Sequence, residues 1–356
     1  MDIMVFDVPA ESGGALSILN DFYQEVVEND DKSVNWIFVL SNPEYKETDN
    51  VKILNFPWVK KSWFHRLYFD HFVAPKLVEK YNIDKIFSLQ NVIIPKTDVE
   101  QILYVHQPLP FSGYKFNIRE NFKFWVYQNI INKKIYSSIK EADKVIVQTH
   151  WMKDASIEKT GINEDKIDVV PPEINLNIKE KFNVSKNKIN RFFFPAGASY
   201  YKNHRLIVEV AKLLKEKNIS DYKVIFTLDG SENDHINELF KEVQRFNLPI
   251  EFRGRLERKD VFNLYTKSYL LFPSYIETFG LPMLEAKLHK TMILASDKAF
   301  SHEILDDYEN AYFFDPFDKE DLMFNMEKLI KNKLEYENVN LESKIKNKSL
   351  YQKVIS

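Results

Sequence analysis

The sequence alternates short apolar runs of strand length with longer stretches of helical apolar spacing, and the alternation continues along most of its 356 residues. It begins with an apolar run at residues 2–8, a loop that contains Gly13 and Gly14, and a helical apolar pattern from Leu16 to Val26. Strands and helices that alternate in this way are typical of a parallel sheet covered by helices on both faces. The expected fold class is therefore α/β, built from doubly wound parallel sheets.

Two domains are expected, because single hydrophobic cores stop growing at roughly 250–300 residues. A polar segment between Pro172 and Asn190 interrupts the alternation once and is interpreted as a linker. We predict an N-terminal domain at residues 1–178, a C-terminal domain at residues 190–338, and a polar tail at residues 339–356 with one helix within residues 341–354. The predicted strands after the first are at residues 36–40, 85–88, 101–106, 144–148, 167–170, 191–195, 223–228, 250–253, 269–272, 291–295 and 311–314. The predicted helices include residues 66–81, 119–139, 204–217, 235–246, 259–267, 281–289 and 301–305.

Composition excludes several classes of protein. A net charge of -3 gives the whole chain no electrostatic attraction to nucleic acid. Cysteine is absent, which excludes disulfides, thiolate zinc sites and a cysteine nucleophile and fits a reducing compartment. No apolar run approaches the roughly 18 residues that span a bilayer, and the N-terminus lacks a signal-peptide core. We expect a cytoplasmic protein, either free or held at the inner face of the cell membrane.

The most informative motif runs from Pro273 to Glu285 and follows the predicted strand at residues 269–272. Pro282 suits the first turn of a helix, where its missing N–H is not needed. The backbone N–H groups of Phe279, Gly280 and Leu281 would then form an anion site at a helix N-terminus. Glu277 would lie before this helix and Glu285 about one turn inside it, so the two carboxylates could flank a ligand. Alternatively, each is an ordinary carboxylate of a helix end.

Two glutamates with seven residues between them, preceded by Pro-Ser and enclosing Phe-Gly-Leu-Pro, resemble the signature of retaining glycosyltransferase family 4. The fold of that family is of the GT-B type, in which two Rossmann-like domains face each other across a cleft. The resemblance extends through most of the C-terminal domain and to several N-terminal loops. It implies that Glu277 lies beside the donor sugar as a catalytic residue and that Glu285 binds the ribose hydroxyls. The amides near Phe279, Gly280 and Leu281 would hold sugar hydroxyls and phosphate.

The first strand of the C-terminal domain is followed by a loop that contains Lys202. A lysine there can neutralise the charge of the departing diphosphate, so Lys202 is predicted to be both catalytic and donor-binding. The family usually carries an arginine a few residues earlier, where this chain has Ala198 and Ser199. Ser199 and Asn203 are further donor-binding candidates, and Arg205 and Arg255 are the candidates to replace the arginine. A solvated lysine at a helix start is the alternative interpretation of Lys202.

Three further loops follow predicted strands. By resemblance, the loop with Arg255 and Leu256 reads the nucleotide base, and Gly13 and Gly14 let the backbone approach the diphosphate. His106 matches the histidine that the family places in its cleft, and a histidine can donate a hydrogen bond to the sugar or stabilise the leaving group. The Asp229-Gly230 pair is equally well interpreted as a plain turn.

Residues 51–140 carry 14 Lys and Arg against six Asp and Glu, and aromatic side chains are mixed with the basic ones near Lys60, Trp63 and Trp125. This mixture suits an anionic membrane surface, although an acceptor groove or an ordinary helix face fits equally well. His, Asp and Glu do not recur at the spacing of metal ligands, so we expect no metal and no cofactor besides the donor substrate.

The resemblance and the residues together predict a retaining hexosyltransferase. It would move a hexose from a nucleotide diphosphate sugar to a hydroxyl of a glycan, plausibly a lipid-linked glycan of a bacterial surface polysaccharide such as O-antigen or capsule. Two alternatives stay open: a sugar-nucleotide epimerase with the same fold, and a subunit that binds sugar nucleotides without turnover.

Overall fold

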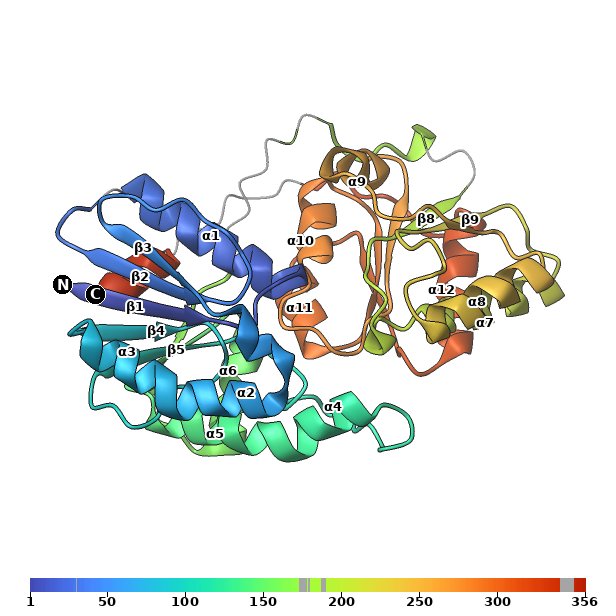
Figure 1. Ribbon diagram of the computed structural model, residues 1–356. Helices are drawn as coiled ribbons and strands as arrows, with labels where there is room; N and C mark the ends of the chain where they lie inside the picture. Colours follow the sequence, from blue (N-terminus) through green and yellow to red (C-terminus); the bar gives the residue numbers. More distant parts are fainter. Residues whose placement is uncertain (30, 173–177, 179, 187–189, 340–348) are drawn as a thin grey trace. The chain divides into compact units, whose positions relative to one another are not determined.

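The computed structural model describes every residue except 30, 173–177, 179, 187–189 and 340–348. It divides into two compact units, the first formed by residues 1–174 and 345–356 and the second by residues 175–344. Each unit contains one parallel sheet with helices on its faces (Figure 1). The prediction of two doubly wound α/β domains is therefore confirmed.

The first unit contains a seven-stranded parallel sheet in the order β3-β2-β1-β4-β5-β6-β7. Its strands are β1 (Asp2–Asp7), β2 (Asn35–Leu40), β3 (Val51–Asn55), β4 (Lys85–Ser88), β5 (Glu100–Val105), β6 (Lys144–Val147) and β7 (Ile167–Val169). Its α-helices are α1 (Gly13–Asn29), α2 (Trp63–Tyr68), α3 (Ala74–Lys80), α4 (Phe122–Val126), α5 (Asn132–Glu141), α6 (His150–Thr160) and α13 (Leu350–Ile355). Short 3-10 turns η1 (Pro57–Lys61) and η4 (Glu164–Lys166) and the π-helical turns η2 (Phe69–Val73) and η3 (Tyr127–Ile131) join them.

Alternate residues of each strand pack on opposite faces of this sheet. Ile3 and Val5 of β1 belong to the core beneath α1, whereas Met4 and Phe6 belong to the core beneath α3. Helices α5 and α6 cover the same face as α3, over β5 and β6. Figure 1 shows α1 on one side of the sheet and α2, α3 and α5 on the other.

The C-terminal helix α13 packs on the first unit, beside α1. The ring of Tyr351 lies 5.7 Å from that of Trp36, Lys85 donates to the backbone oxygen of Val354, and Lys353 forms an ion pair with Asp168 at 2.9 Å. The described end of the predicted tail forms a helix at Leu350–Ile355, and residues 345–356 are grouped with the first unit. Residues 340–348 of the predicted helix lie outside the described part of the chain.

The second unit contains a six-stranded parallel sheet in the order β10-β9-β8-β11-β12-β13. Its strands are β8 (Arg191–Phe194), β9 (Lys223–Phe226), β10 (Ile250–Phe252), β11 (Tyr269–Phe272), β12 (Ile293–Ser296) and β13 (Ala311–Phe314). Its α-helices are α7 (His204–Glu216), α8 (Asp234–Arg245), α9 (Arg258–Tyr265), α10 (Leu281–Leu288), α11 (Ala299–Leu305) and α12 (Lys319–Ile330), and 3-10 turns lie at η5 (Val184–Lys186) and η6 (Tyr200–Lys202). Helix α7 packs against α8 and α12, and α10 packs against α11.

Two elements were not predicted. Strand β3 at the sheet edge was missed because Lys52 and Asn55 interrupt its apolar residues, of which only Val51 is buried. Helix α12 was not predicted as an element of the second unit, whereas the helix predicted at residues 66–81 is present as α2, η2 and α3, which follow one another without a break. Part of the predicted linker packs on the second unit, where the N–H groups of Phe182 and Asn183 donate to the backbone oxygens of His289 and Thr266.

Counted from the first strand of each unit, the first six strands of both sheets have the order 3-2-1-4-5-6, and the first sheet adds β7 at its edge. The order reverses between β1 and β4 in the first unit and between β8 and β11 in the second. In open parallel sheets, ligands bind outside the carboxyl ends of the strands at such a switch point. The loops after β1, β4, β8 and β11 are therefore where the fold itself predicts binding.

Candidate active-site residues in the two units

Lys202 and Glu277 meet at the switch point of the second unit. Lys202 ends η6 in the loop after β8, Glu277 lies in the loop after β11, and the Nζ atom of Lys202 bonds to Oε1 of Glu277. The N–H of Tyr275 donates to the backbone oxygen of Tyr201 at 3.1 Å and holds the two loops together. The side chains of the pair are only 20% and 13% exposed. Two residues that lie 75 positions apart in the sequence thus form one partly buried ion pair.

The charge of Lys202 is maintained by this pairing. Burial alone acts to lower the pKa of Lys202, but the carboxylate of Glu277 outweighs it and raises the pKa above its ordinary value. Lys202 is therefore a cation at neutral pH in a site that is mostly screened from water. Such a cation interacts with an anion more strongly than one on the open surface does.

Helix α10 begins beside this pair with an end that is open to a ligand. Gly280 precedes it with φ +88, a conformation that favours glycine, and a Cβ at this position would lie 2.5 Å from Cε of Met283. Among the described residues no side chain caps the helix. The first N–H groups of an α-helix have no partner within the helix, so the amides of Phe279, Gly280 and Leu281 are placed to bind an anion.

Glu285 lies on the first turns of α10 and is held by two side chains of α9. The hydroxyl of Tyr265 donates to its Oε2 at 3.0 Å, and Nη2 of Arg258 lies 3.5 Å from its Oε1. Burial raises the pKa of the Glu285 carboxyl, although Tyr265 and Arg258 both act to lower it. A carboxylate accepts about four hydrogen bonds, so two ribose hydroxyls could bind beside these partners.

Asn203 has a supporting position in this site. Its backbone adopts φ +66 at the junction of η6 and α7, and its amide donates to the backbone oxygens of Pro273 and Pro316. The bond to Pro273 ties the Lys202 loop to the Glu277 loop, and the bond to Pro316 ties it to the segment after β13. Ser199 precedes η6, where its backbone oxygen accepts from the N–H of Lys202 at 2.9 Å.

The two candidate replacements for the missing arginine differ in the structure. Arg205 lies 3.4 Å from Oε2 of Glu242 on α8 and is engaged there. Arg255 is exposed in the loop after β10, next to Leu256. That loop is anchored by Gly254, whose N–H donates to the backbone oxygen of Leu228 at 2.9 Å. Arg255 is therefore the freer of the two candidates to reach a bound nucleotide.

The Asp229-Gly230 pair forms a turn after β9. Oδ1 of Asp229 accepts hydrogen bonds from the N–H and the hydroxyl of Ser231. Gly230 adopts φ +97, and a Cβ there would lie 2.7 Å from the ring of Phe240. Both residues thus have structural reasons to occupy these positions.

His106 lies at the carboxyl end of β5 in the first unit and is fixed on two sides. Its Nε2 lies 2.9 Å from the backbone oxygen of Leu89, and its N–H and that of Gln107 donate to Oδ1 of Asn91 at 2.7 and 2.9 Å. Because a carbonyl oxygen only accepts, the bond to Leu89 places a proton on Nε2. Burial lowers the pKa of His106 to about 4, so the ring is neutral near pH 7.

Gly13 and Gly14 form the exposed start of α1, directly after the β1 loop. Gly13 adopts φ +63, and a Cβ at either glycine would meet none of the described atoms within 4 Å. The backbone is therefore accessible there, as the approach of a phosphate requires.

Sequence reasoning missed Asp7 in the first unit and the partners of Glu285 in the second. Asp7 ends β1 with 1% of its surface exposed, and burial raises the pKa of its carboxyl to about 7. A single acidic residue at the end of the apolar run Ile-Met-Val-Phe was the available signal. Nothing in the sequence distinguishes Tyr265 or Arg258 as neighbours of Glu285.

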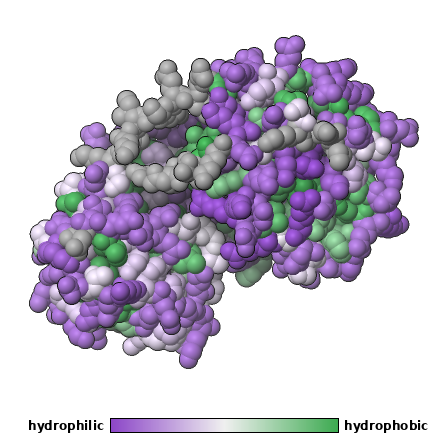
Figure 2. Space-filling view, turned by 90° about the horizontal axis from the view of Figure 1, so that it is seen from above, coloured by the Kyte–Doolittle hydropathy of each residue, from purple (hydrophilic) through white to green (hydrophobic). Residues whose placement is uncertain are grey.

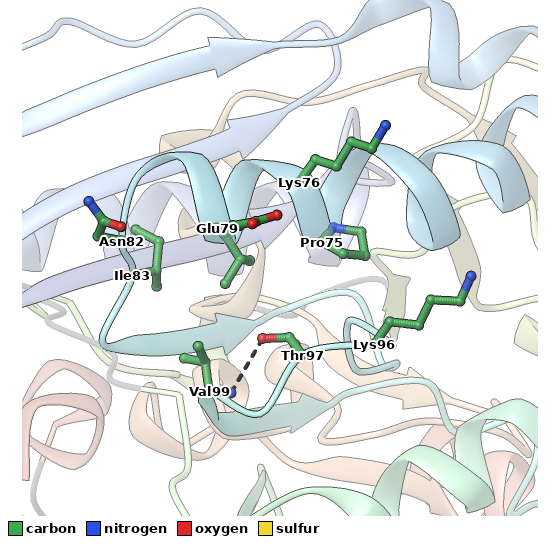
Figure 3. A pocket seen from close by; sticks show the side chains of 9 residues that line it. Pro75, Lys76, Glu79, Asn82, Ile83, Lys96, Thr97 and Val99 are labelled. Carbon is green, nitrogen blue, oxygen red and sulfur yellow. Dashed lines mark hydrogen bonds between the residues drawn. The ribbon is translucent and has the colours of Figure 1, made fainter.

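A surface pocket of about 430 Å³ lies elsewhere on the first unit (Figure 3). It is formed by α3 and the segment before β5, and it is lined by Pro75, Lys76, Val78, Glu79, Asn82, Ile83, Lys96, Thr97 and Val99. Ile83 precedes β4 and Val99 precedes β5, so the pocket lies at the amino ends of these strands. The candidate residues of this unit lie at the opposite, carboxyl ends.

Within the described residues, no three or more His, Asp or Glu side chains gather where they could hold a metal ion. None of the helices that the structure describes is long and apolar enough to cross a membrane. In the view of Figure 2, hydrophilic residues predominate on the surface of both units, with smaller hydrophobic patches between them.

Each unit matches a family model of glycosyltransferases. Residues 35–178 match the model of Glycosyltransferase Family 4, and residues 177–348 match that of Glycosyl transferases group 1. Similar solved structures include HepE of Anabaena in complex with UDP and glucose (16% identity, TM-score 0.68, 93% of this chain and 90% of that chain). Another is the sucrose-phosphate synthase of Thermosynechococcus elongatus (15% identity, TM-score 0.69, 93% and 90%). The chain is a glycosyltransferase of the GT-B type.

Two similar proteins of known name come from bacteria. The O-antigen chain mannosyltransferase RfbU of Salmonella typhimurium is 25% identical over 255 residues, which are 70% of this chain and 66% of RfbU. The mannosylfructose-phosphate synthase of Agrobacterium fabrum is 24% identical over 262 residues, 68% of this chain and 56% of that enzyme. The chain thus aligns with somewhat less than two thirds of the length of these two proteins.

Proposed function

We propose that this chain transfers a hexose from a nucleotide diphosphate sugar to a hydroxyl of a glycan, with retention of the anomeric configuration. One observation carries the proposal: the Lys202–Glu277 pair lies at the switch point of the second unit, beside the uncapped start of α10. A cation and a set of free amides next to a carboxylate suit a ligand with an anionic diphosphate at one end and a sugar at the other.

The diphosphate would bind between Lys202 and the amides of Phe279, Gly280 and Leu281. Its leaving oxygen gains negative charge as the glycosidic bond breaks, and these groups stabilise that charge without having to reorient. Glu277 then places a carboxylate beside the sugar carbon, where positive charge develops in the transition state. In this proposal the phosphate charge is neutralised by the chain itself, and no metal ion is needed.

Glu285 would bind the ribose, and the loop with Arg255 and Leu256 would contact the base. The partial burial of Glu285 and its bond to Tyr265 fix the direction of its free lone pairs. The structure of HepE was solved in complex with UDP-glucose. This supports a uridine diphosphate sugar as the first donor to test. Gly13, Gly14 and His106 would contact the donor or the acceptor from the first unit.

The acceptor is proposed to be a lipid-linked glycan of a bacterial surface polysaccharide. RfbU, an O-antigen chain mannosyltransferase, and the lipopolysaccharide galactosyltransferase WaaB, whose structure has a TM-score of 0.66, support this class of acceptor. In the first unit, Trp63 and Phe64 at the start of α2 are 56% and 82% exposed next to Lys60 and Lys61. Exposed aromatic rings with adjacent lysines suit an anionic membrane surface.

The membrane part of the proposal is tested by sedimentation with anionic liposomes. Lys60 is paired with Glu11 and Arg66 with Asp70, so changing these two cations also disturbs the fold. Phe64→Ser and Lys61→Glu avoid this difficulty, and we expect both to reduce sedimentation. A parent protein that stays in the supernatant would end this part of the proposal.

The transfer itself is tested in two steps. Calorimetry against UDP, GDP and ADP identifies the nucleotide, and hydrolysis of the matching nucleotide sugars identifies the donor. We expect one nucleotide to bind with a Kd in the micromolar to millimolar range. We also expect slow hydrolysis of the matching nucleotide sugar when no acceptor is present. An altered nucleotide sugar as product would indicate the epimerase.

Binding without any turnover would indicate the non-catalytic subunit. One observation favours this second candidate: Ala198 and Ser199 occupy the positions of the family's arginine, and Arg205 is engaged by Glu242. Arg255→Ala separates the two candidates, because it lowers turnover only if Arg255 has taken over the phosphate contact.

A further inference from the structure

The surface pocket beside α3 has an apolar floor and charged residues at its rim (Figure 3). Val78 and Ile83 line its floor, are 3% and 6% exposed, and belong to the core beneath α3. Lys76, Glu79 and Lys96 are exposed at the rim, and among the described residues none of the three forms an ion pair. Its volume of about 430 Å³ lies within the range of roughly 300–1,000 Å³ that is typical of ligand sites. The pocket is thus large enough for a small ligand, and its charged groups are not paired with opposite charges.

The two lysines lie toward one end of the pocket. Figure 3 shows Lys76 on α3 and Lys96 on the segment before β5 at the same end, with Asn82 at the other end. The backbone of Lys96 adopts φ +61, a conformation that is uncommon for residues other than glycine and in which asparagine is enriched. Two ammonium groups near each other attract an anion, and lysine commonly binds phosphate as a point charge. This end of the pocket therefore suits a phosphate group.

Glu79 places a negative charge between the lysines and the Asn82 end (Figure 3). It follows Lys76 by three residues on α3, so the Cβ atoms of the two residues are about 5–6 Å apart. A ligand with negative charge alone would be repelled by the carboxylate of Glu79. Phosphoethanolamine instead carries a phosphate and, at the other end of a short ethylene link, an ammonium with N–H groups to donate. The order of its two charges matches the order of lysines and glutamate along the pocket.

Exposed aromatic rings border the lysine end of the pocket. Nζ of Lys96 lies 4.7 Å from the centre of the Phe72 ring, and Phe72 stacks on Tyr68 with the ring centres 5.5 Å apart. The two aromatic residues are 53% and 56% exposed. Exposed aromatic side chains next to lysines suit the boundary between the head groups and the acyl chains of a membrane. A lipid with its phosphate at the lysine end would therefore have its acyl chains beside Phe72 and Tyr68.

We propose that this pocket binds the phosphoethanolamine head group of a membrane lipid, with the phosphate at Lys76 and Lys96 and the ammonium at Glu79. The pocket lies at the amino ends of β4 and β5, away from the candidate catalytic residues. The bound lipid thus fixes how the first unit lies on the membrane and takes no part in transfer. The lipid as the source of the head group rests on the membrane contact in the proposed function, whereas binding of the head group itself does not.

Two kinds of vesicle test the proposal with the full chain. Both contain the same fraction of phosphatidylglycerol. The remainder is phosphatidylcholine in one kind and a mixture of phosphatidylcholine and phosphatidylethanolamine in the other. Choline and ethanolamine carry the same charge, so both vesicles attract a basic surface equally, but the trimethylammonium of choline has no N–H to donate to Glu79. We expect the parent protein to bind the vesicles with phosphatidylethanolamine about three- to tenfold more tightly in a sedimentation assay.

Glu79→Gln removes the charge that distinguishes the two head groups and keeps the shape of the side chain, so it should lose the preference. Lys76→Gln and Lys96→Asn should weaken binding of the vesicles with phosphatidylethanolamine. Because asparagine tolerates φ +61, Lys96→Asn should not lower the Tm. Lys80→Gln is the matched control: Lys80 also lies on α3 but does not line the pocket, and this variant should keep the preference.

Soluble head groups separate the pocket from the membrane contact. Glycerophosphoethanolamine and glycerophosphocholine are added to the full chain, and NMR follows the methyl signals of Val78 and Ile83 on the floor of the pocket. We expect the first compound to shift these signals more than the second, and Glu79→Gln to remove the difference. Phe64→Ser lies in α2, outside the pocket. It should keep this response while reducing sedimentation with both kinds of vesicle.

Two results would overturn the inference: a parent that distinguishes neither the two kinds of vesicle nor the two soluble head groups, and a preference that survives in Glu79→Gln. A parent that recognises the soluble head group but sediments with neither kind of vesicle contradicts the lipid as its source. Calorimetry with UDP, GDP and ADP tests the proposed transfer separately, because the pocket contains none of the candidate donor-binding residues. Absent nucleotide binding would contradict the proposed function and leave the result on the pocket unchanged.

Discussion

The first six strands of the two sheets have the same order, but the polar groups near the two switch points differ in whether they have partners. In the second unit, Lys202 and Glu277 form an ion pair, so both charges are satisfied before any ligand arrives. In the first unit, Asp7 and Gln90 are buried and keep polar atoms without partners among the described residues. A charged site that is already paired suits an anion that competes for the cation. Buried polar atoms without partners act to destabilise the first unit.

The largest effect is expected from breaking the pair in the second unit. Lys202→Ala removes the cation of the proposed diphosphate site and leaves Glu277 without its partner, so we expect kcat/KM to fall about 10²–10³-fold. Steady-state turnover and nucleotide calorimetry measure the loss. Lys212→Ala is the control. Lys212 on α7 forms an ion pair with Glu242 on α8, and neither residue belongs to the loops after β8 and β11. Full activity of both Lys202→Ala and Glu277→Ala would contradict the assignment.

A smaller effect is expected at Glu285. Glu285→Ala should weaken nucleotide binding about 10–100-fold, since hydrogen bonds to a charged group contribute roughly 1.5–3 kcal/mol. The parent should bind the 2′-deoxy form of its nucleotide more weakly than the ribose form, and the variant should lose that preference. Tyr265→Phe is the control, because it removes a donor to Glu285 but keeps the carboxylate. An unchanged preference in Glu285→Ala would place the ribose elsewhere.

His106 tests the first unit through pH. Its pKa of about 4 lies below the ordinary value of roughly 6.5, so between these values the folded chain binds fewer protons than the unfolded chain. Stability should therefore fall as pH decreases from about 6.5 to 4. His106→Gln should remove up to about 3 kcal/mol from the change in the free energy of unfolding over this pH range. Urea unfolding at several pH values measures this change. It should also lower kcat about tenfold through one lost hydrogen bond. A His106 ring that titrates near pH 6.5 by NMR would contradict the neutral role.

The last comparison concerns backbone geometry and affects stability rather than activity in each unit. In Gly280→Ala the backbone would have to keep φ +88 and the new Cβ would clash with Met283. In Gly161→Ala the backbone would have to keep φ +68, but the new Cβ would have no described atom within 4 Å. We expect losses of about 2–3 kcal/mol and about 1 kcal/mol, respectively. Calorimetric unfolding measures both. Equal losses would mean that Met283 moves aside at little cost.

The sequence predicts the strands of this fold better than the contacts of its site. β4, β11 and β13 begin and end where predicted, because each contains a short apolar run with polar residues or proline close to its ends. The edge strand β3 and the weakly amphipathic α6 give no such signal. Sequence placed Lys202 and Glu277 in loops at the same edge of the sheet, but their direct bond depends on loop conformations that the structure alone provides.

The same limit applies to the environment of single residues. The burial of Asp7 depends on neighbours from several segments of the chain, and no local pattern records it. Likewise, the bond from Tyr265 to Glu285 joins α9 to α10, which are separated in the sequence by strand β11. Local spacing predicts which end of a sheet a residue occupies, whereas its pKa and its partners depend on the packing of distant segments.

The return of the C-terminal helix to the first unit has a practical consequence for dividing the molecule. Residues 345–356 belong to the first unit, although the second unit precedes them in the chain. A single cut after residue 174 would therefore leave the first unit without α13, exposing Trp36 and the apolar residues beneath that helix. A self-sufficient first unit has to carry this helix as well, for example through a short artificial connection in place of the entire second unit.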